Sequence, residues 1–348
     1  MNSVNKQQIL VSLTNWMQIT DVIEKKDKMI IRGYLLPGET PDLVQSRIKP
    51  LVPDLRYQRT GGMDSFTIYL QKTVFGIPRI NLLLFIATVF TTLLAGALME
   101  GVNPLENPVG IIQGIPFSVT LLLILGVHET GHFLTARKYH VDATLPYFLP
   151  APTIIGTFGA FIKMRSPVRR RRALVEIGAA GPIAGFIVAV PALFIGLSLS
   201  SVAPASAQAS VQLGESIIMK IATGIVYPGL PDHADIMLHP VGFAAWIGML
   251  VTMLNLLPIG QLDGGHIAYA LLAKWYSKIA WGALVAILLL SLLSPNWLIW
   301  AVLVYFLTRM KHPPIMDESE PVTRREKWIG ITAGIIFILT FIPVPFKF

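Results

Sequence analysis

The residues best suited to chemistry lie in the segment His128-Glu129-Thr-Gly-His132, inside the apolar stretch LLILGVHETGHFLTARK. On a helix, residues four positions apart lie on the same face, so both imidazoles can reach one metal ion. Glu129 lies beside them, where it could take a proton from an attacking water molecule. The alternative is a structural cluster of polar side chains packed between helices. Ionisable residues inside a membrane helix are costly, and this cost favours a functional site.

A zinc ion at two histidines needs at least one more protein ligand, with a further position left for water. The chain has no cysteine, so carboxylates are the candidates, and those expected at membrane depth are Glu176 and Asp263. Glu176 follows the basic run Arg169–Arg172, and an ion pair at the membrane surface explains it. Asp263 follows an apolar run that ends at Pro258, in irregular backbone that a membrane tolerates only when protein buries it or when it lines a wet cavity. This position favours Asp263 as the third ligand.

Several neighbouring residues carry weaker signals. His266 lies one turn after Asp263 and could orient that carboxylate, whereas His312 lies in a loop and is expected to be solvated. The glycines of a later apolar segment form a stripe of small residues that indicates close packing between helices. The members of this stripe are Gly178, Gly181 and Gly185.

The composition identifies the setting of these residues. Only 14% of the 348 residues are charged, whereas soluble domains carry about 25%. Residues 1–80 hold 18 of the charges and residues 81–348 hold 30, among apolar runs near the ~20 residues that span a bilayer. A wholly soluble enzyme is therefore excluded. The absence of cysteine excludes disulfides, thiol nucleophiles, cysteine-bound zinc and iron–sulfur clusters.

Residues 1–78 are expected to form a small soluble α+β domain that serves docking or folding, because they contain no catalytic constellation. Its predicted elements are a strand at Met29–Leu35, a helix at Thr40–Leu51 and strands at Leu55–Arg59 and Ser65–Leu70 around the turn Gly61-Gly62.

The remainder is predicted to be a polytopic α-helical membrane protein with about seven spans. We expect an intramembrane core at 79–310, and a cytoplasmic linker with a final span at 311–348. The fifth and sixth spans are short and could form one broken hairpin. The spans are expected near 81–102, 115–137, 173–199, 241–258, 279–294, 296–310 and 328–344.

The distribution of Lys and Arg predicts the orientation. If the N-terminus is cytoplasmic, the later cytoplasmic connections hold fifteen basic residues, against two on the opposite side. This is a strong positive-inside bias. The net charge of +8 is thereby explained by membrane topology, with Arg169–Arg172 contacting lipid headgroups. Nucleic acid is not expected as a partner.

The segment Thr153–Met164, TIIGTFGAFIKM, is apolar, β-branched and interrupted by glycines. It is predicted to be a strand or a short membrane-associated β hairpin at the cytoplasmic face. An exposed edge there could pair with an unwound substrate segment. The alternative is a hairpin that only packs on the membrane surface.

HETGH on one membrane helix and the pattern N-x-x-P-x-x-x-x-D-G-G from Asn255 to Gly265 resemble the site-2 protease family of intramembrane zinc metalloproteases. The resemblance covers about 81–310. It is closest to the chloroplast and cyanobacterial branch known from ethylene-dependent gravitropism-deficient mutants. Similarity to that branch extends to Leu145–Pro152, Gly156–Phe161, Gly178–Pro182 and the small N-terminal domain.

The resemblance implies a three-helix catalytic core with one Zn²⁺ per chain held by His128, His132 and Asp263. Glu129 would be the catalytic acid and base, and Asn255 would bind substrate backbone or stabilise developing negative charge. The substrates implied are transmembrane proteins, usually trimmed first by another protease. The PDZ insertion of some bacterial members is absent.

The function expected is hydrolysis of peptide bonds in or near transmembrane segments, as in regulated intramembrane proteolysis. The alternatives are a zinc transporter and a non-catalytic adaptor on the same scaffold. Because the sequence begins without a transit-type segment, the expected location is the cytoplasmic membrane of a cell, with a thylakoid or plastid membrane as the second choice. Membrane lipids are expected contacts. The substrate, the triggering cleavage and the oligomeric state stay open.

Overall fold

The computed structural model divides the chain into two compact units, Met1–Pro78 and Arg79–Phe348. Parts of several predicted segments lie outside the described residues: 49–51 of the predicted helix, residue 70 of the last predicted strand, residue 169 of the basic run, 309–310 of the sixth span, and 311, 313–314 and 316–320 of the linker. The structure describes residues 3–347 except 25–27, 49–54, 70–76, 105, 169, 205–211, 232–233, 309–311, 313–314 and 316–320.

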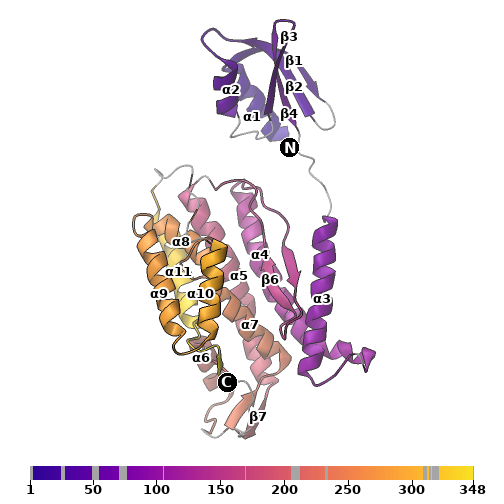
Figure 1. The fold of residues 1–348 in the computed structure, drawn as a ribbon, viewed down its shortest axis with the longest axis vertical. Coiled ribbons are helices and arrows are strands. Elements are labelled where there is room, and N and C mark those ends of the chain that lie inside the picture. The colour runs from indigo at the N-terminus through magenta and orange to yellow at the C-terminus, as the bar shows by residue number, and fades with distance from the viewer. Residues whose placement is uncertain are drawn as a thin grey trace. The chain divides into compact units, whose positions relative to one another are not determined.

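The N-terminal unit is an antiparallel sheet with the strand order β1-β2-β4-β3 and two helices (Figure 1). Gly61 and Gly62 turn the chain between β3 and β4 with φ angles of 60° and 82°, which glycine adopts readily. The pattern predicts α2 and the last three strands but neither α1 nor β1. The elements are α1 (Ser3–Thr14), β1 (Met17–Glu24), β2 (Lys28–Leu35), α2 (Pro41–Ile48), β3 (Leu55–Thr60) and β4 (Met63–Tyr69).

The second unit is mainly helical. Its helices are α3 (Arg79–Met99), η1 (Pro108–Gly114), α4 (Ile115–Lys138), α5 (Arg171–Ser198), α6 (Ile217–Val226), α7 (Pro240–Asn255), α8 (Asp263–Leu272), α9 (Tyr276–Leu290), α10 (Asn296–Thr308) and α11 (Arg324–Thr340). Antiparallel strand pairs join β5 (Tyr147–Pro150) to β6 (Thr157–Phe161), β7 (Ser201–Pro204) to β9 (Ala234–Met237) and β8 (Gln212–Leu213) to β10 (Phe346–Lys347).

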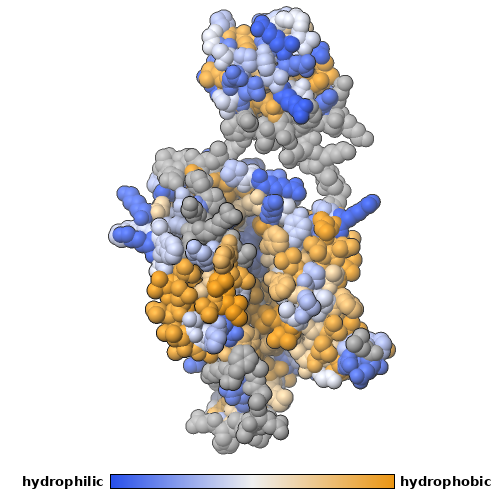
Figure 2. Space-filling model, viewed as in Figure 1, coloured by the Kyte–Doolittle hydropathy of each residue, from blue (hydrophilic) through white to orange (hydrophobic). Residues whose placement is uncertain are grey.

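Three helical segments of the described chain are long and apolar enough to cross a membrane: α3, η1 with α4, and α5. The other predicted spans coincide with shorter helices, so the number of seven spans is not confirmed. The helix α7, for example, has 16 residues, which is about 24 Å against a hydrocarbon thickness of ~30 Å. In Figure 2 the visible sides of the helical unit are largely hydrophobic, as expected for lipid-facing surfaces.

The helix α5 lies at the centre of this unit and contacts α4, α7, α8 and α11 (Figure 1). Small residues permit the closest approach, since a Cβ at Gly131 of α4 would lie 2.6 Å from the Ala180 carbonyl oxygen of α5. The helices α4 and α5 are therefore held together at the HETGH segment itself.

The hairpin β5–β6 lies against α3, the helix that contacts β5 most extensively (Figure 1). Asn81 Nδ2 donates to the carbonyl oxygens of Leu145 and Pro146, and Thr91 Oγ1 donates to the Gly156 carbonyl oxygen at 2.6 Å. The predicted strand at Thr153–Met164 thus appears as the shorter β6, and its partner β5 was not expected to be a strand.

Candidate metal centre

The helix α4 carries the HETGH segment one to three turns before its C-terminal end at Lys138. His128 and His132 are buried, with exposed fractions of 3% and 6%, and their rings lie 4.9 Å apart between centroids. The helical spacing thus places both imidazoles on one face, as the motif predicts.

Asp263 is the first residue of α8 and follows a short loop after α7. The loop turns at Gly260, which has a φ of 58°, a conformation that costs little for glycine. It folds back tightly onto α8, because a Cβ at Gly264 would overlap the Leu256 carbonyl oxygen and one at Gly265 would lie 2.8 Å from that of Ile259. The two glycines after Asp263 therefore let the loop bring this carboxylate to α4.

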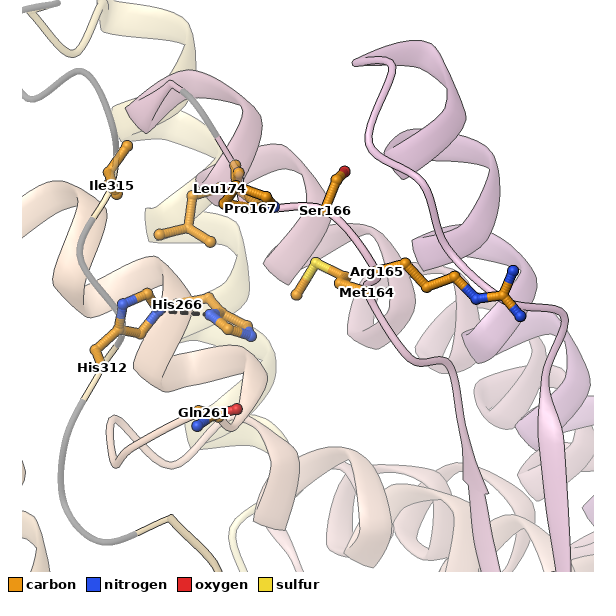
Figure 3. A pocket seen from close by; sticks show the side chains of 10 residues that line it. Met164, Arg165, Ser166, Pro167, Leu174, Gln261, His266, His312 and Ile315 are labelled. Carbon is orange, nitrogen blue, oxygen red and sulfur yellow. Dashed lines mark hydrogen bonds between the residues drawn. The ribbon is translucent and has the colours of Figure 1, made fainter. Parts of the chain in front are cut away.

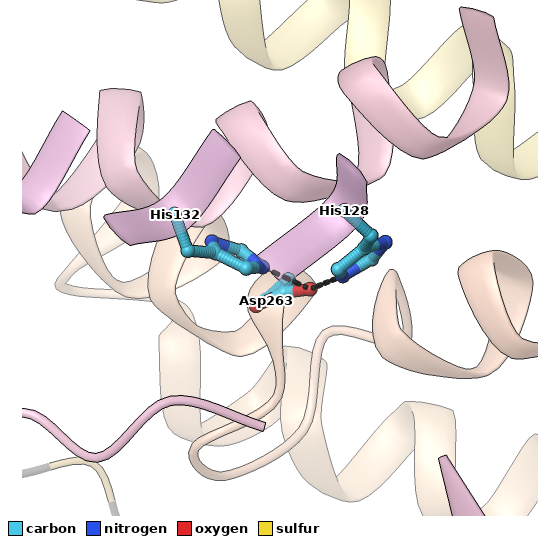
Figure 4. Close-up of side chains that lie close together, drawn as sticks. All are labelled: His128, His132 and Asp263. Carbon is cyan, nitrogen blue, oxygen red and sulfur yellow. Dashed lines mark ion pairs between the residues drawn. The ribbon is translucent and has the colours of Figure 1, made fainter. Parts of the chain in front are cut away.

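The three side chains meet at one point, as Figure 4 shows. Asp263 Oδ2 lies 3.3 Å from His128 Nε2 and 3.2 Å from His132 Nε2. One ligand atom from each residue lies within 4.8 Å of the other two. Zinc binds nitrogen and oxygen ligands at 2.0–2.2 Å, and tetrahedral geometry then separates two ligand atoms by about 3.3 Å. The N–O separations in this structure match that value, so the residues fit a zinc ion.

The orientation of His132 is set by α5. Its Nδ1 lies 2.7 Å from the Ile177 carbonyl oxygen, so Nδ1 carries the proton and donates. Nε2 is then the nitrogen with the lone pair, and it faces Asp263. A backbone carbonyl in this position is a common support for a metal-binding histidine.

The glycine stripe of α5 has a more specific place than general helix packing. A Cβ at Gly181 would overlap the His132 ring at Nε2, and one at Gly185 would lie 3.1 Å from His128 Nδ1. A Cβ at Gly178 would lie 3.0 Å from the His266 Cβ and 3.1 Å from the Asp263 carbonyl oxygen. The stripe therefore makes room for the side chains of the candidate metal centre.

We expect Gly181→Ala to lower the zinc affinity of the purified protein by at least about tenfold, as losses of supporting contacts do, because the added methyl displaces the His132 ring. Gly334→Ala is the matched control, since a Cβ there meets nothing within 4 Å. Alanine is otherwise the better helix former. Equal zinc affinities in both variants would show that Gly181 has no bearing on the site.

Glu129 lies on α4 between the two histidines in sequence and is 5% exposed. The backbone amide of Ile162, the residue after β6, lies close enough to its carboxylate to interact with it electrostatically. The residue that would move protons thus contacts the β5–β6 hairpin directly.

Asn255, the last residue of α7, also reaches this centre. Its Nδ2 lies 3.4 Å from His128 Nε2, which is a long contact for a hydrogen bond. The side-chain amide is therefore placed beside the nitrogen that faces Asp263.

Two further expectations concern histidines near Asp263. His266 was expected to orient the Asp263 carboxylate. Among the described residues, its Nδ1 instead forms a hydrogen bond with His312 Nε2 at 2.6 Å. The expectation of a solvated His312 is wrong, because its ring packs against α8. The sequence offers no signal for this contact, since 46 residues separate the two histidines.

Glu176 lies outside the metal centre and has basic partners instead. Its Oε2 lies 2.6 Å from Lys138 Nζ, and its Oε1 lies 3.5 Å from an Arg325 nitrogen. These ion pairs join the end of α4, the start of α5 and the start of α11, as the ion-pair interpretation of Glu176 predicts.

The chain is similar to known proteins over much of its length. Residues 116–293, about half of the chain, match Peptidase family M50. The chain is 32% identical over 243 residues to "Probable zinc metalloprotease EGY2, chloroplastic" of Arabidopsis thaliana, which covers 68% of this chain and 43% of the relative. The protein of the same name from Oryza sativa subsp. japonica is 31% identical over 277 residues, or 76% and 49% of the two chains. "Probable zinc metalloprotease EGY1, chloroplastic" of Arabidopsis thaliana is 33% identical over 239 residues, or 66% and 43%.

The chain spans less than half the length of these relatives. No solved structure matches it.

The expectation of a cell membrane is wrong. The relatives just described are all named chloroplastic, which points to a plastid or thylakoid membrane. The expectation rested on the first residues of the sequence, from which no location follows, and the count of basic residues reports only which side of a membrane a loop occupies. It does not report which membrane the protein occupies.

Proposed function

Because this chain belongs to peptidase family M50, a membrane-embedded family of site-2 protease type, we propose that it is an intramembrane zinc endopeptidase of a plastid membrane. It would hydrolyse peptide bonds in or near the transmembrane segments of other membrane proteins. The observation that carries the proposal is the position of Asp263 Oδ2, 3.3 and 3.2 Å from the two Nε2 atoms of the HETGH histidines.

His128, His132 and Asp263 are the residues that would hold the zinc ion. Zinc bound there supplies a Lewis acid that makes water more acidic and polarises the scissile carbonyl. The contact of His132 with the Ile177 carbonyl oxygen holds the ring in the required tautomer. Both histidines are buried, which limits the number of water molecules that can contact them.

Glu129 is the residue proposed to move protons. It would accept one from the attacking water and return it to the leaving amine. Its carboxylate lies beside the Ile162 backbone amide, at the end of the hairpin where a substrate would lie. Asn255, beside His128 Nε2, is placed to bind substrate backbone or to stabilise negative charge on the carbonyl oxygen.

The hairpin β5–β6 is the proposed binding element for substrate. A transmembrane helix must unwind before its backbone can be cut, and an extended segment can then pair with a strand edge. The contact between Ile162 and Glu129 supports this role, because it places the end of β6 beside the residue that would move protons.

We further propose seven spans, with the N-terminal unit and the basic connections on the same side of the membrane. His132 lies five residues before Arg137, which is about 7.5 Å along the helix. The zinc site would then lie a short distance below that surface, within reach of water.

The experiment that tests the proposed function uses the purified protein in liposomes with a single-span membrane protein as substrate. We expect about one zinc ion per chain, loss of cleavage after chelation and recovery when Zn²⁺ is returned. Zinc flux across the liposome in place of cleavage would support a transporter. If the chain binds zinc but shows neither zinc flux nor cleavage, the result would support a non-catalytic adaptor.

A further inference from the structure

The His312 side chain lies outside the candidate metal centre but packs against the helix that begins with Asp263. Figure 3 shows its ring directed at His266 of α8, with the hydrogen bond between them. The ring also stacks on Tyr269, with centroids 4.2 Å apart and planes at 14°. An imidazole after α10 is thus held by two side chains of α8.

The contacts of His312 belong to a cluster of four rings, His266, Tyr269, Tyr276 and His312, which we term the ring cluster. Tyr276, the first residue of α9, meets Tyr269 edge to face at 5.3 Å and His312 at 6.0 Å. Edge-to-face and offset-stacked pairs of this kind are favourable beyond their buried area. The cluster therefore joins α8 and the start of α9 to a residue that lies 36 positions further along the chain.

The ring cluster also contacts the loop that leads to Asp263. Tyr276 Oη donates to the Gly260 carbonyl oxygen at 3.0 Å, in a buried hydrogen bond. Gly260 is the residue at which this loop turns. The cluster thus holds the loop before Asp263 through Tyr276 and the helix after Asp263 through His266.

The start of α8 also packs against α5. Gly178 lies so close that a Cβ there would be 3.0 Å from the His266 Cβ and 3.1 Å from the Asp263 carbonyl oxygen. The first turn of α8 is therefore in contact with both the α5 backbone and the ring cluster. Loss of the ring cluster would leave this turn with its α5 contacts alone.

A cavity of about 260 Å³ lies beside His266 and His312 (Figure 3). Its walls include Leu174, Gln261 and Ile315. Because this cavity adjoins the His312 ring, truncation of that side chain would enlarge it and leave His266 and Tyr269 with fewer contacts.

We propose that His312 is a positioning residue for the metal centre, which acts through His266 and Tyr269 to hold Asp263 in place for the ion. This inference rests on the proposed function, because it assigns His312 a role in the same zinc site. His312 does not touch the ion or the substrate.

The test compares His312→Ala and His312→Phe with the wild-type chain. The readouts are zinc affinity, measured by competition with a chromophoric chelator, the split between kcat and KM for a single-span substrate, and the Tm. His312→Ala removes both contacts, whereas His312→Phe keeps the stacking on Tyr269 and loses the hydrogen bond to His266. His239→Ala is the matched control, since this imidazole caps α7 by accepting a hydrogen bond from the Val241 N–H.

We expect His312→Ala to lower zinc affinity by about 10–100-fold, as loss of supporting contacts does in other metal sites. We also expect kcat to fall with little change in KM. His312→Phe should show a smaller loss of zinc affinity, and His239→Ala should lower the Tm and leave zinc affinity unchanged. If His312→Ala does not fold, the comparison of His312→Phe with His239→Ala decides.

Wild-type zinc affinity and kcat in the His312 variants would overturn the inference and leave the proposed function intact. A loss of zinc affinity in His239→Ala equal to that in the His312 variants would overturn it too, because general destabilisation would then explain the effect. A wild-type chain that binds no zinc would refute the proposed function and this inference with it.

Discussion

Glu129→Gln is expected to bind zinc as the wild-type chain does and to lose cleavage activity by about 10²–10⁴-fold, the usual contribution of a general base. The amide has nearly the same shape as the carboxylate but cannot accept and return a proton. The measurement is the initial rate of cleavage of a single-span substrate in liposomes, with the zinc content determined on the same sample.

Glu106→Gln is the matched control, because Glu106 is exposed and bonds to Asn103 away from the helices of the site. Wild-type rates are expected for it. An active Glu129→Gln variant would contradict the assignment of the proton-moving residue, even if zinc is present.

Asp263→Ala has the second large expected effect, a loss of zinc affinity of more than about 100-fold, because removal of a direct ligand exceeds the effect of removing a supporting residue. The substitution leaves two imidazoles without the carboxylate that lies 3.2 and 3.3 Å from their Nε2 atoms. Cleavage is lost together with the metal. The measurement is zinc affinity by chelator competition, followed by the cleavage rate.

Glu176→Gln controls for the removal of a buried carboxylate from this unit. Its partners are Lys138 and Arg325, so it is expected to lower the Tm and leave zinc affinity unchanged. If Asp263→Ala retained wild-type zinc affinity, the third ligand would have to be another residue.

The paired histidines could be predicted from the sequence because a helix determines the relation between positions four apart. Asp263 lies 131 residues after His132 in the chain. Its proximity to the histidines could be predicted only from its position after a broken apolar helix. A carboxylate after a broken apolar helix needs a buried, polar partner, and the histidines meet that need. The resemblance to the site-2 protease family, confirmed by the match to family M50, rests on these two segments.

The supporting contacts could not be predicted in the same way. A glycine stripe indicates that something packs closely, but it does not say whether a backbone or an imidazole fills the space at Gly181. His312 lies between polar and proline residues that read as a solvated loop, and its contact with α8 depends on how α9 and α10 return the chain. Contacts of this kind are set by tertiary packing and have no local periodicity.

Two elements of the fold, α1 and β5, cannot be predicted from the residue pattern because their own sequences are atypical. The helix α1, SVNKQQILVSLT, has a mixed pattern without a clear apolar face, and the strand β5, YFLP, ends in a proline that reads as a loop. The span predicted at 241–258 is shorter in the structure, because α7 ends at Asn255 and the loop to Asp263 follows.

Anomalous diffraction at the zinc absorption edge, from crystals of the purified protein, would show whether His128, His132 and Asp263 hold a zinc ion together. We expect one peak per chain among His128 Nε2, His132 Nε2 and the Asp263 carboxylate, about 2.0–2.2 Å from each ligand atom. No peak in fully zinc-loaded crystals, or a peak with Asp263 out of reach, would contradict it.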